Sequence, residues 1–246
     1  MISKRQASHP APYNMALMPV FVDILQRYRI HKILDPFAGT GRIFRLWDSL
    51  DVDITAVEIE PKWAKMHPCT TVGDALNLPE SWVGRYQAIV TSPTFGNRMA
   101  DHFVDSQVDE DGNPKYVRNT YFHCLGEELQ PNNSGQLPFG PDYCVFEQQW
   151  MIEMRRVLTD SGLLVFEMKD SYKTIQRKGA KIKRRVRATL WHIFCAQNLG
   201  YKLLESHRVY SNGNTQGANR ERVEYSTVLV FCKGECTHQK LTVDNE

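Results

Sequence analysis

The sequence predicts an α/β fold built on a mostly parallel β-sheet. Between residues 33 and 95, short apolar segments typical of buried strands alternate with amphipathic helical segments. Turns containing glycine or proline separate these segments, and two further apolar strands close the chain. Such alternation is typical of parallel strands joined by crossover helices. The 246 residues show no internal repeat, so we expect one domain spanning residues 1–246.

The first half of the chain contains four of the predicted strands. Residues 15–29 carry apolar side chains at helical spacing, among them Leu17, Phe21 and Ile24, and precede the first strand as a helix. A second helix is expected over GRIFRLWDSL and a short third one over PKWAKMH, opened by proline. The strand segments are KILDP, DITAVEIE, TTVGD and YQAIVTSP.

The second half begins with an interruption. Residues 96–141 are polar and lack sustained periodicity, so we interpret them as an insertion involved in substrate recognition. Regularity returns with a helix over 142–158, which places Tyr143, Phe146, Trp150 and Met154 on one side. A fifth strand (162–170), a helix (186–199) and two strands (201–210 and 223–233) complete seven predicted strands.

The segment DPFAGTG (residues 35–41) follows the first strand and opens the next helix. Gly39 and Gly41 permit a tight turn with no Cβ between the backbone and a ligand. Phosphate-binding glycine loops carry Gly-Lys-Ser/Thr, whereas Arg42 follows Gly41 here. The acidic Asp35 favours a cationic ligand, such as the amino group or the sulfonium of S-adenosylmethionine (SAM).

Polar residues also end the next three strands. Glu58 closes the second strand, about 20 residues after the glycine turn, where an acidic side chain typically accepts ribose hydroxyls. Asp74 follows the third strand and Ser92 the fourth. Because carboxyl ends of parallel strands meet at one edge of the sheet, this set predicts a ligand site there.

The chain resembles the amino-methyltransferases of DNA over residues 8–170. DPFAGTG resembles their SAM-binding motif, AVEIEP the ribose motif, GDA the adenine motif, TSPTF the catalytic motif and SHPAPY the arm covering the methionine end of SAM. The resemblance implies a Rossmann-like SAM-dependent methyltransferase fold, with strand order 3-2-1-4-5-7-6 and an antiparallel seventh strand. It implies these cofactor-binding residues: His9, Pro10, Tyr13, Asp35, Phe37, Ala38, Gly39, Thr40, Gly41, Glu58, Asp74 and Ala75.

The same resemblance assigns catalysis to Ser92, Pro93, Thr94 and Phe95. The Ser92 hydroxyl and the Pro93 carbonyl are expected to accept hydrogen bonds from the target amino group, and Phe95 to stack on the flipped base. Serine in the first position favours cytosine N4 over adenine N6. Thr94 stands where the family has a second proline, and we expect it to loosen the turn.

A basic segment, residues 173–187, contains eight cations and no acid, which indicates contacts with nucleic-acid phosphates. The alternative is a disordered, solubilising loop. Within the insertion, Arg98, His102, Arg118, Asn119, His123, Asn132 and Asn133 are candidate contacts to base edges and phosphates. The residues assigned to nucleic-acid binding are Arg98, Lys181, Lys183, Arg184, Arg185 and Arg187.

The sequence therefore favours a DNA amino-methyltransferase acting on a base flipped from double-stranded DNA. The alternatives are an RNA base amino-methyltransferase and a catalytically weakened nucleic-acid-binding subunit.

The six cysteines are scattered, and the sequence has no signal-like N-terminus and no long apolar run. These features favour a cytoplasmic location and no membrane contact. A bacterial or phage modification system is expected by family analogy alone. Cys232, Cys236 and His238 lack a zinc spacing, so no metal is expected.

Overall fold

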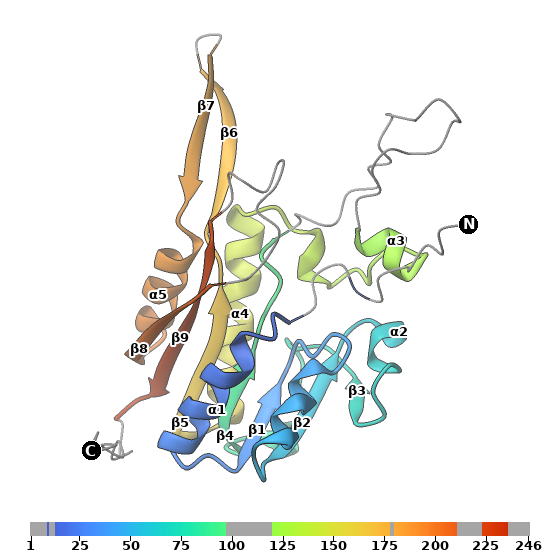
Figure 1. The fold of residues 1–246 in the computed structure, drawn as a ribbon, viewed down its shortest axis with the longest axis vertical. Helices are drawn as coiled ribbons and strands as arrows, with labels where there is room; N and C mark the ends of the chain where they lie inside the picture. The colour runs from blue at the N-terminus through green and yellow to red at the C-terminus, as the bar shows by residue number, and fades with distance from the viewer. Residues whose placement is uncertain (1–8, 10–12, 97–119, 178–179, 211–222, 236–246) are drawn as a thin grey trace.

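A computed structural model describes His9 and residues 13–96, 120–177, 180–210 and 223–235 (Figure 1). Its main sheet has seven strands in the order β3-β2-β1-β4-β5-β9-β8. Since β8 and β9 are the sixth and seventh predicted strands, the predicted order is confirmed. β9 runs antiparallel to both of its neighbours, while the pairs among β1 to β5 are parallel. The bounds are β1 Lys32–Asp35, β2 Asp53–Glu58, β3 Thr70–Val72, β4 Tyr86–Thr91, β5 Leu158–Met168, β8 Tyr201–Tyr210 and β9 Tyr225–Lys233.

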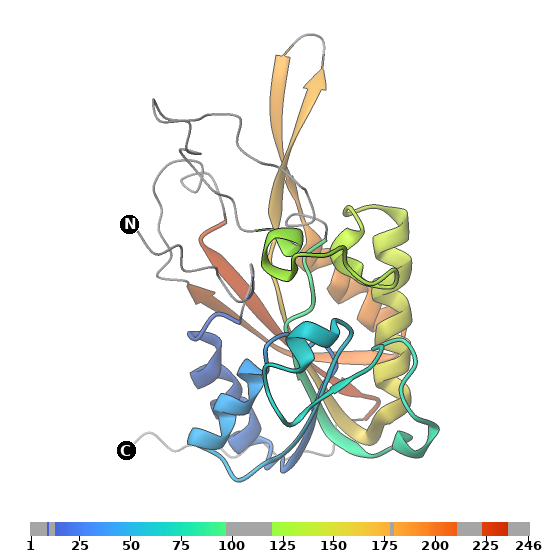
Figure 2. The same ribbon diagram turned by 90° about the vertical axis from the view of Figure 1, so that its right-hand side faces the viewer.

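Helices cover both faces of this sheet (Figures 1 and 2). The predicted helix over 41–50 is a 3-10 helix, η1, and the remaining predicted helices are α-helical. No helix in the described ranges combines the length and the apolarity that crossing a bilayer requires. The bounds are α1 Leu17–Arg27, η1 Arg42–Asp48, α2 Pro61–Ala64, η2 Glu80–Trp82, α3 Tyr121–Leu125, η3 Ser134–Gln136, α4 Pro141–Val157 and α5 Ala188–Asn198.

The hydrophobic core lies in two layers, one on each side of the sheet. Successive residues of a strand point to opposite faces, so Ile33 packs with α1 and η1, whereas Leu34 packs with α4 and α5. The apolar side of α4 is buried as its periodicity predicts, with Trp150 fully enclosed. Coverage on both faces explains why the central strands read as continuous apolar runs.

A two-stranded hairpin was absent from the predicted set. β6 (Ser171–Arg177) and β7 (Ala180–Val186) form a separate two-stranded antiparallel sheet, which extends β5 beyond the body of the molecule (Figures 1 and 2). Its many charged side chains hide the alternation that identifies a half-buried strand. The insertion contains α3 and η3, which polar sequence also concealed, and residues 97–119 lie outside the described residues.

Candidate active site

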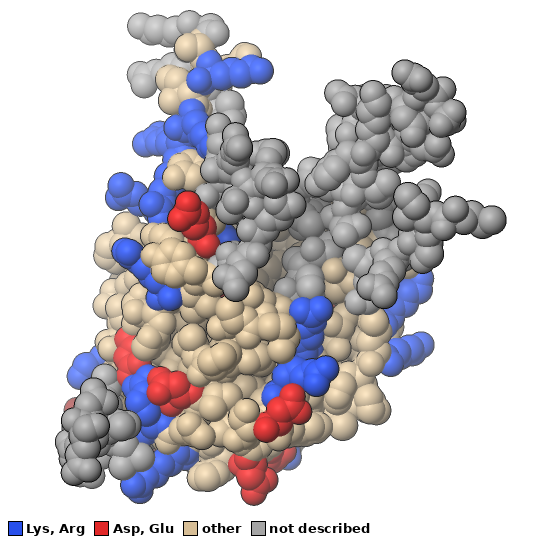
Figure 3. All heavy atoms as spheres, in the orientation of Figure 1, with Lys and Arg blue, Asp and Glu red and all other residues tan. Residues whose placement is uncertain are grey.

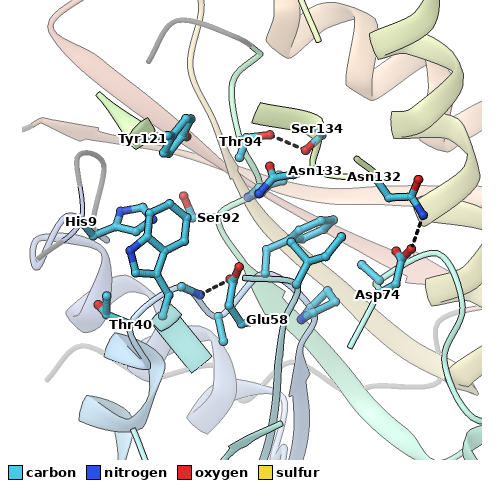
Figure 4. Close-up of a pocket in the computed structure, with 18 of the residues that line it drawn as sticks. His9, Thr40, Glu58, Asp74, Ser92, Thr94, Tyr121, Asn132, Asn133 and Ser134 are labelled. Carbon is cyan, nitrogen blue, oxygen red and sulfur yellow. Dashed lines mark hydrogen bonds between the residues drawn. The ribbon is translucent and has the colours of Figure 1, made fainter. Parts of the chain in front are cut away.

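A pocket opens at the carboxyl ends of β1, β2 and β4 (Figure 4). The chain crosses from β3 at one edge to β4 beside β1, so the pocket lies where strand order reverses, the usual ligand site of open α/β sheets. No lysine or arginine is among its described lining residues. It is lined by His9, Tyr13, Pro36, Phe37, Ala38, Gly39, Thr40, Glu58, Ile59, Trp63, Asp74, Ala75, Ser92, Pro93, Thr94, Phe95, Tyr121, Asn132, Asn133, Ser134 and Phe146.

The glycine turn forms one wall of the pocket. Gly39 and Gly41 have φ values of +54° and +78°, a region that side-chain-bearing residues rarely adopt. At Gly41 there is also no room, because a Cβ would lie 2.5 Å from the Cβ of His67. At Gly39 a Cβ would meet only the His9 ring, at 3.8 Å. Gly41 is therefore required by packing, while Gly39 keeps the backbone close to the pocket.

Glu58, at the end of β2, is buried with only 6% of its surface exposed. Its Oε2 accepts a hydrogen bond from the Gly39 amide at 2.7 Å, and its Oε1 accepts one from the Glu60 amide at 2.9 Å. Burial raises the pKa of this carboxyl to about 7, which outweighs the opposing effect of the two amides. The side chain thus joins the glycine turn to the loop after β2.

This raised pKa makes the stability of the ligand-free protein depend on pH. The unfolded chain releases the Glu58 proton near pH 4.5 and the folded protein near pH 7. Protonated Glu58 therefore contributes fully to the stability of the folded state below pH 4.5. This contribution is lost as pH rises through 7, which lowers the free energy of unfolding by up to about 3 kcal/mol. In urea titrations from pH 5 to 8, we expect the free energy of unfolding to fall more steeply for the wild type than for Glu58→Gln. If the free energy of unfolding changed with pH equally in the wild type and in Glu58→Gln, the raised pKa of Glu58 would be contradicted.

Asp35 lies beneath the pocket rather than in its wall. The residue has no exposed surface, and its carboxylate accepts hydrogen bonds from the Tyr13 and Thr91 hydroxyls, both at 2.6 Å, and from the Phe37 amide at 3.1 Å. Burial raises its pKa to about 6. The sequence suggested an acidic group facing a cation, but the structure gives Asp35 three internal donors. It holds the arm residue Tyr13 against β1 and β4.

The TSPTF turn after β4 forms the opposite wall. The Ser92 hydroxyl donates to Glu167 Oε2 at 2.7 Å, and Glu167 lies near the end of β5 with 5% of its surface exposed. The Tyr143 hydroxyl donates to the Thr94 carbonyl at 2.8 Å, and the Thr94 and Ser134 hydroxyls are hydrogen bonded to each other. The turn is thus fixed from three directions.

All four proposed catalytic residues line the pocket, together with His9, Tyr13, Phe37, Ala38, Gly39, Thr40, Glu58, Asp74 and Ala75. Gly41 lies behind the wall, like Asp35, and Pro10 and Arg98 fall outside the described residues. The sequence did not single out Trp63 or Tyr121. These two rings are in tilted contact, with centroids 5.7 Å apart, and pack with Leu125 and Leu129. Through this contact the insertion packs against α2. In the sequence, the local signal for Trp63 was the predicted helix PKWAKMH, which contains it.

The predicted basic residues lie together on the hairpin. Lys181, Lys183, Arg184 and Arg185 belong to β7, and Arg187 follows it at the start of α5, all exposed. Arg185 is committed to the base of the hairpin: it pairs with Asp170 at 2.9 Å and donates to the Tyr225 hydroxyl at 3.2 Å. Asp170 also accepts from the Thr189 amide at 2.9 Å, which ties the hairpin to α5.

Comparison with known proteins identifies the fold. No family model matches the chain, and no curated protein does. Among solved structures, a 1,6-didemethyltoxoflavin-N1-methyltransferase of Burkholderia thailandensis, bound to S-adenosylhomocysteine, is 12% identical with a TM-score of 0.52, covering 90% of this chain and 80% of that one. A putative SAM-dependent methyltransferase of Listeria monocytogenes is 9% identical with a TM-score of 0.51, covering 89% and 99%.

The fold is that of the SAM-dependent methyltransferases. The [4+2]-cyclase SpnF matches as well, at 11% identity and a TM-score of 0.52, covering 91% of this chain and 84% of that one. Because this methyltransferase fold also occurs in a protein described as a cyclase, the reaction has to be argued from the pocket itself.

Proposed function

We propose that this protein transfers the methyl group of SAM to an exocyclic amino nitrogen of a DNA base, with cytosine N4 favoured over adenine N6. The observation that carries this proposal is the convergence of four segments on one pocket. The glycine turn, Glu58, Asp74 and the TSPTF turn follow four different strands and all line it. The parallel sheet brings these four strand ends to one edge, and the residues that they place there are the ones the cofactor and catalytic motifs require.

The chemistry of the pocket fits SAM. Two carboxylates, Glu58 and Asp74, line it, and its described lining residues include neither lysine nor arginine, so it favours a sulfonium cation over a phosphate. Glu58 would accept ribose hydroxyls, and Asp74 with Ala75 would hold the adenine. Phe37 and Ala38 offer apolar contacts, and His9 and Tyr13 close the methionine end. Bound SAM supplies an electrophilic methyl group.

The TSPTF turn would hold the target amino group. An amino nitrogen of cytosine or adenine is a poor nucleophile, because its lone pair is delocalised into the ring. Since the Ser92 proton points to Glu167, the Ser92 oxygen keeps lone pairs that can accept an amino N–H. Together with the Pro93 carbonyl, it would favour a tetrahedral nitrogen, and Phe95 would stack on the base.

The β6–β7 hairpin would bind the DNA backbone. Alternate residues of β7 face opposite sides, so Lys181 and Lys183 lie on one face and Arg184 on the other. The Lys183 ammonium lies 4.8 Å from the centre of the Tyr172 ring, and lysine and arginine side chains are exposed on the described part of the hairpin (Figure 3). The hairpin leaves the sheet at the edge that holds the pocket. Its seven-residue strands extend roughly 24 Å, and a two-stranded ribbon fits the major groove.

Neutralising this hairpin should weaken DNA binding without regard to base sequence. We expect the Lys181→Gln/Lys183→Gln/Arg184→Gln variant to reduce the slope of log K against log salt by about 0.9 for each lost phosphate contact. Arg185 is left intact because it fastens the hairpin to the body. An Arg29→Gln/Arg85→Gln/Lys202→Gln variant, which loses the same charge at exposed sites away from the hairpin, serves as the control. If the slope of log K against log salt were the same for the two variants, the hairpin would be a solvated surface that makes no phosphate contacts.

The reaction is tested by expressing the protein in a methylation-deficient bacterium and analysing nucleosides of its DNA and RNA by mass spectrometry. We expect N4-methylcytosine in the DNA. N6-methyladenine in the DNA would change the base but retain the reaction class. If methylated bases were found only in RNA, the protein would be an RNA base methyltransferase and the DNA proposal would be wrong. Stoichiometric SAM binding with both nucleic acids unmodified would favour a weakened binding subunit.

A further inference from the structure

Three consecutive residues of the insertion, Asn132, Asn133 and Ser134, bridge the loops that follow three different strands (Figure 4). Asn132 Nδ2 donates to Asp74 Oδ2, after β3, at 3.1 Å. Asn133 Nδ2 donates to Glu60 Oε1, after β2, at 2.7 Å. The Ser134 hydroxyl is hydrogen bonded to that of Thr94, after β4. We call residues 132–134 the clasp.

The middle of the clasp is firmly anchored. Glu60 has 1% of its surface exposed, and its Oε1 accepts a second hydrogen bond from the Gln130 amide at 2.8 Å. Asn133 Oδ1 accepts from the Gly135 amide at 2.8 Å, which starts η3 and places the Ser134 hydroxyl at the TSPTF turn. Ser134 itself is 3% exposed. The buried Glu60 carboxylate therefore holds Asn133, the residue directly before the Ser134 that contacts Thr94.

Thr94 needs such a restraint. A proline at this position would fix φ near −65°, whereas threonine leaves φ free to vary. Here the Thr94 side chain is held by Ser134 and its carbonyl by Tyr143, whose hydroxyl donates at 2.8 Å. The sequence predicts that Thr94 loosens the turn, and the hydrogen bonds from Ser134 and Tyr143 are contacts that would limit this freedom.

We propose that the clasp positions the catalytic turn, with Ser134 acting through Thr94 in place of a second proline. This inference rests on the proposed function for its effect on turnover, but not for its effect on the turn. Because Asn132 contacts Asp74 at the cofactor end, the clasp also joins the cofactor loop to the catalytic turn. Ser134 and Thr94 are positioning residues, and displacement of Ser92 and Pro93 by even 1 Å can cost about 10²-fold in rate.

The kinetic test combines three substitutions. We expect Ser134→Ala to lower kcat by about 10–100-fold with little change in the Kd of SAM. Thr94→Val should act equally, and the double variant should be no worse than either single one, since both remove one bond. Thr94→Pro should restore turnover in the Ser134→Ala background, because a proline needs no partner. Gln136→Ala, which removes an exposed hydrogen bond to the Gln130 carbonyl in the same loop, is the control.

A second measurement does not depend on activity. We expect hydrogen exchange of the Phe95 and Gly96 amides to be faster in Ser134→Ala than in the wild type, and slowed again by adding Thr94→Pro, which itself has no amide at residue 94. If amide hydrogen exchange were unchanged in both Ser134→Ala and Thr94→Val, the proposed role of the clasp would be wrong. It would also be wrong if the reductions in kcat from these two substitutions were additive. A wild-type protein that methylates no nucleic acid would overturn the proposed function instead, and the exchange rates would still decide the inference.

Discussion

Replacing Ser92 by alanine is expected to lower methyl transfer by about 10²–10³-fold while leaving the affinity for SAM unchanged. The side chain lines the pocket and donates its proton to Glu167, so its oxygen is oriented to accept a hydrogen bond from the target amino group. A preorganised acceptor of this kind acts on the transition state, and its loss costs roughly 3–4 kcal/mol. Single-turnover kinetics and calorimetry separate the two quantities.

Two variants sharpen this test. Ser161→Ala removes a half-buried hydroxyl that donates to the Glu235 carbonyl and does not line the pocket, so it should leave turnover unchanged. Glu167→Gln keeps a hydrogen-bond partner for Ser92 but lets an amide compete as donor, so it should lower kcat less than Ser92→Ala does. A Ser92→Ala protein with wild-type turnover would falsify the catalytic assignment, whatever the fold.

Replacing Asp35 by alanine is expected to destabilise the whole protein by on the order of 3–9 kcal/mol. Three donors, the Tyr13 and Thr91 hydroxyls and the Phe37 amide, would lose their buried acceptor. Each such orphaned group costs about 1–3 kcal/mol, and a typical domain has only about 5–15 kcal/mol in total. Urea denaturation measures the loss. A change below about 1 kcal/mol would contradict it.

Asp35→Asn separates this buried role from a direct contact with the ligand. Its amide oxygen can still accept from Thr91 and Phe37, and the Tyr13 hydroxyl can turn to accept from the new NH2 group. We therefore expect a loss of stability of only about 1 kcal/mol and near-normal SAM affinity. If Asp35 instead faced the cationic ligand, the asparagine variant would fold well but bind SAM much more weakly.

The local sequence was sufficient to predict the strands of the main sheet. KILD, DITAVE and YQAIVT are apolar because helices cover both of their faces, and the glycine turn follows the first of them. The hairpin was missed because the residues of β7 are almost all exposed, so no buried face imposes an alternating pattern. Where burial does not select the side chains, periodicity carries no signal.

The sequence by itself determined the strand segments, the edge of the sheet that holds the pocket and the side chains that end the strands, because periodicity and turn residues are local properties. The strand order was expected only from the resemblance to the amino-methyltransferases of DNA. Only the tertiary structure decided what those side chains contact. Ser92 meets Glu167 across 75 residues, and Thr94 meets Ser134 across 40. Asp35 is buried although an acid normally prefers water, and two of its three donors, the Tyr13 and Thr91 hydroxyls, come from distant parts of the chain. Such hydrogen bonds depend on how folded elements pack, and no spacing within the chain encodes them.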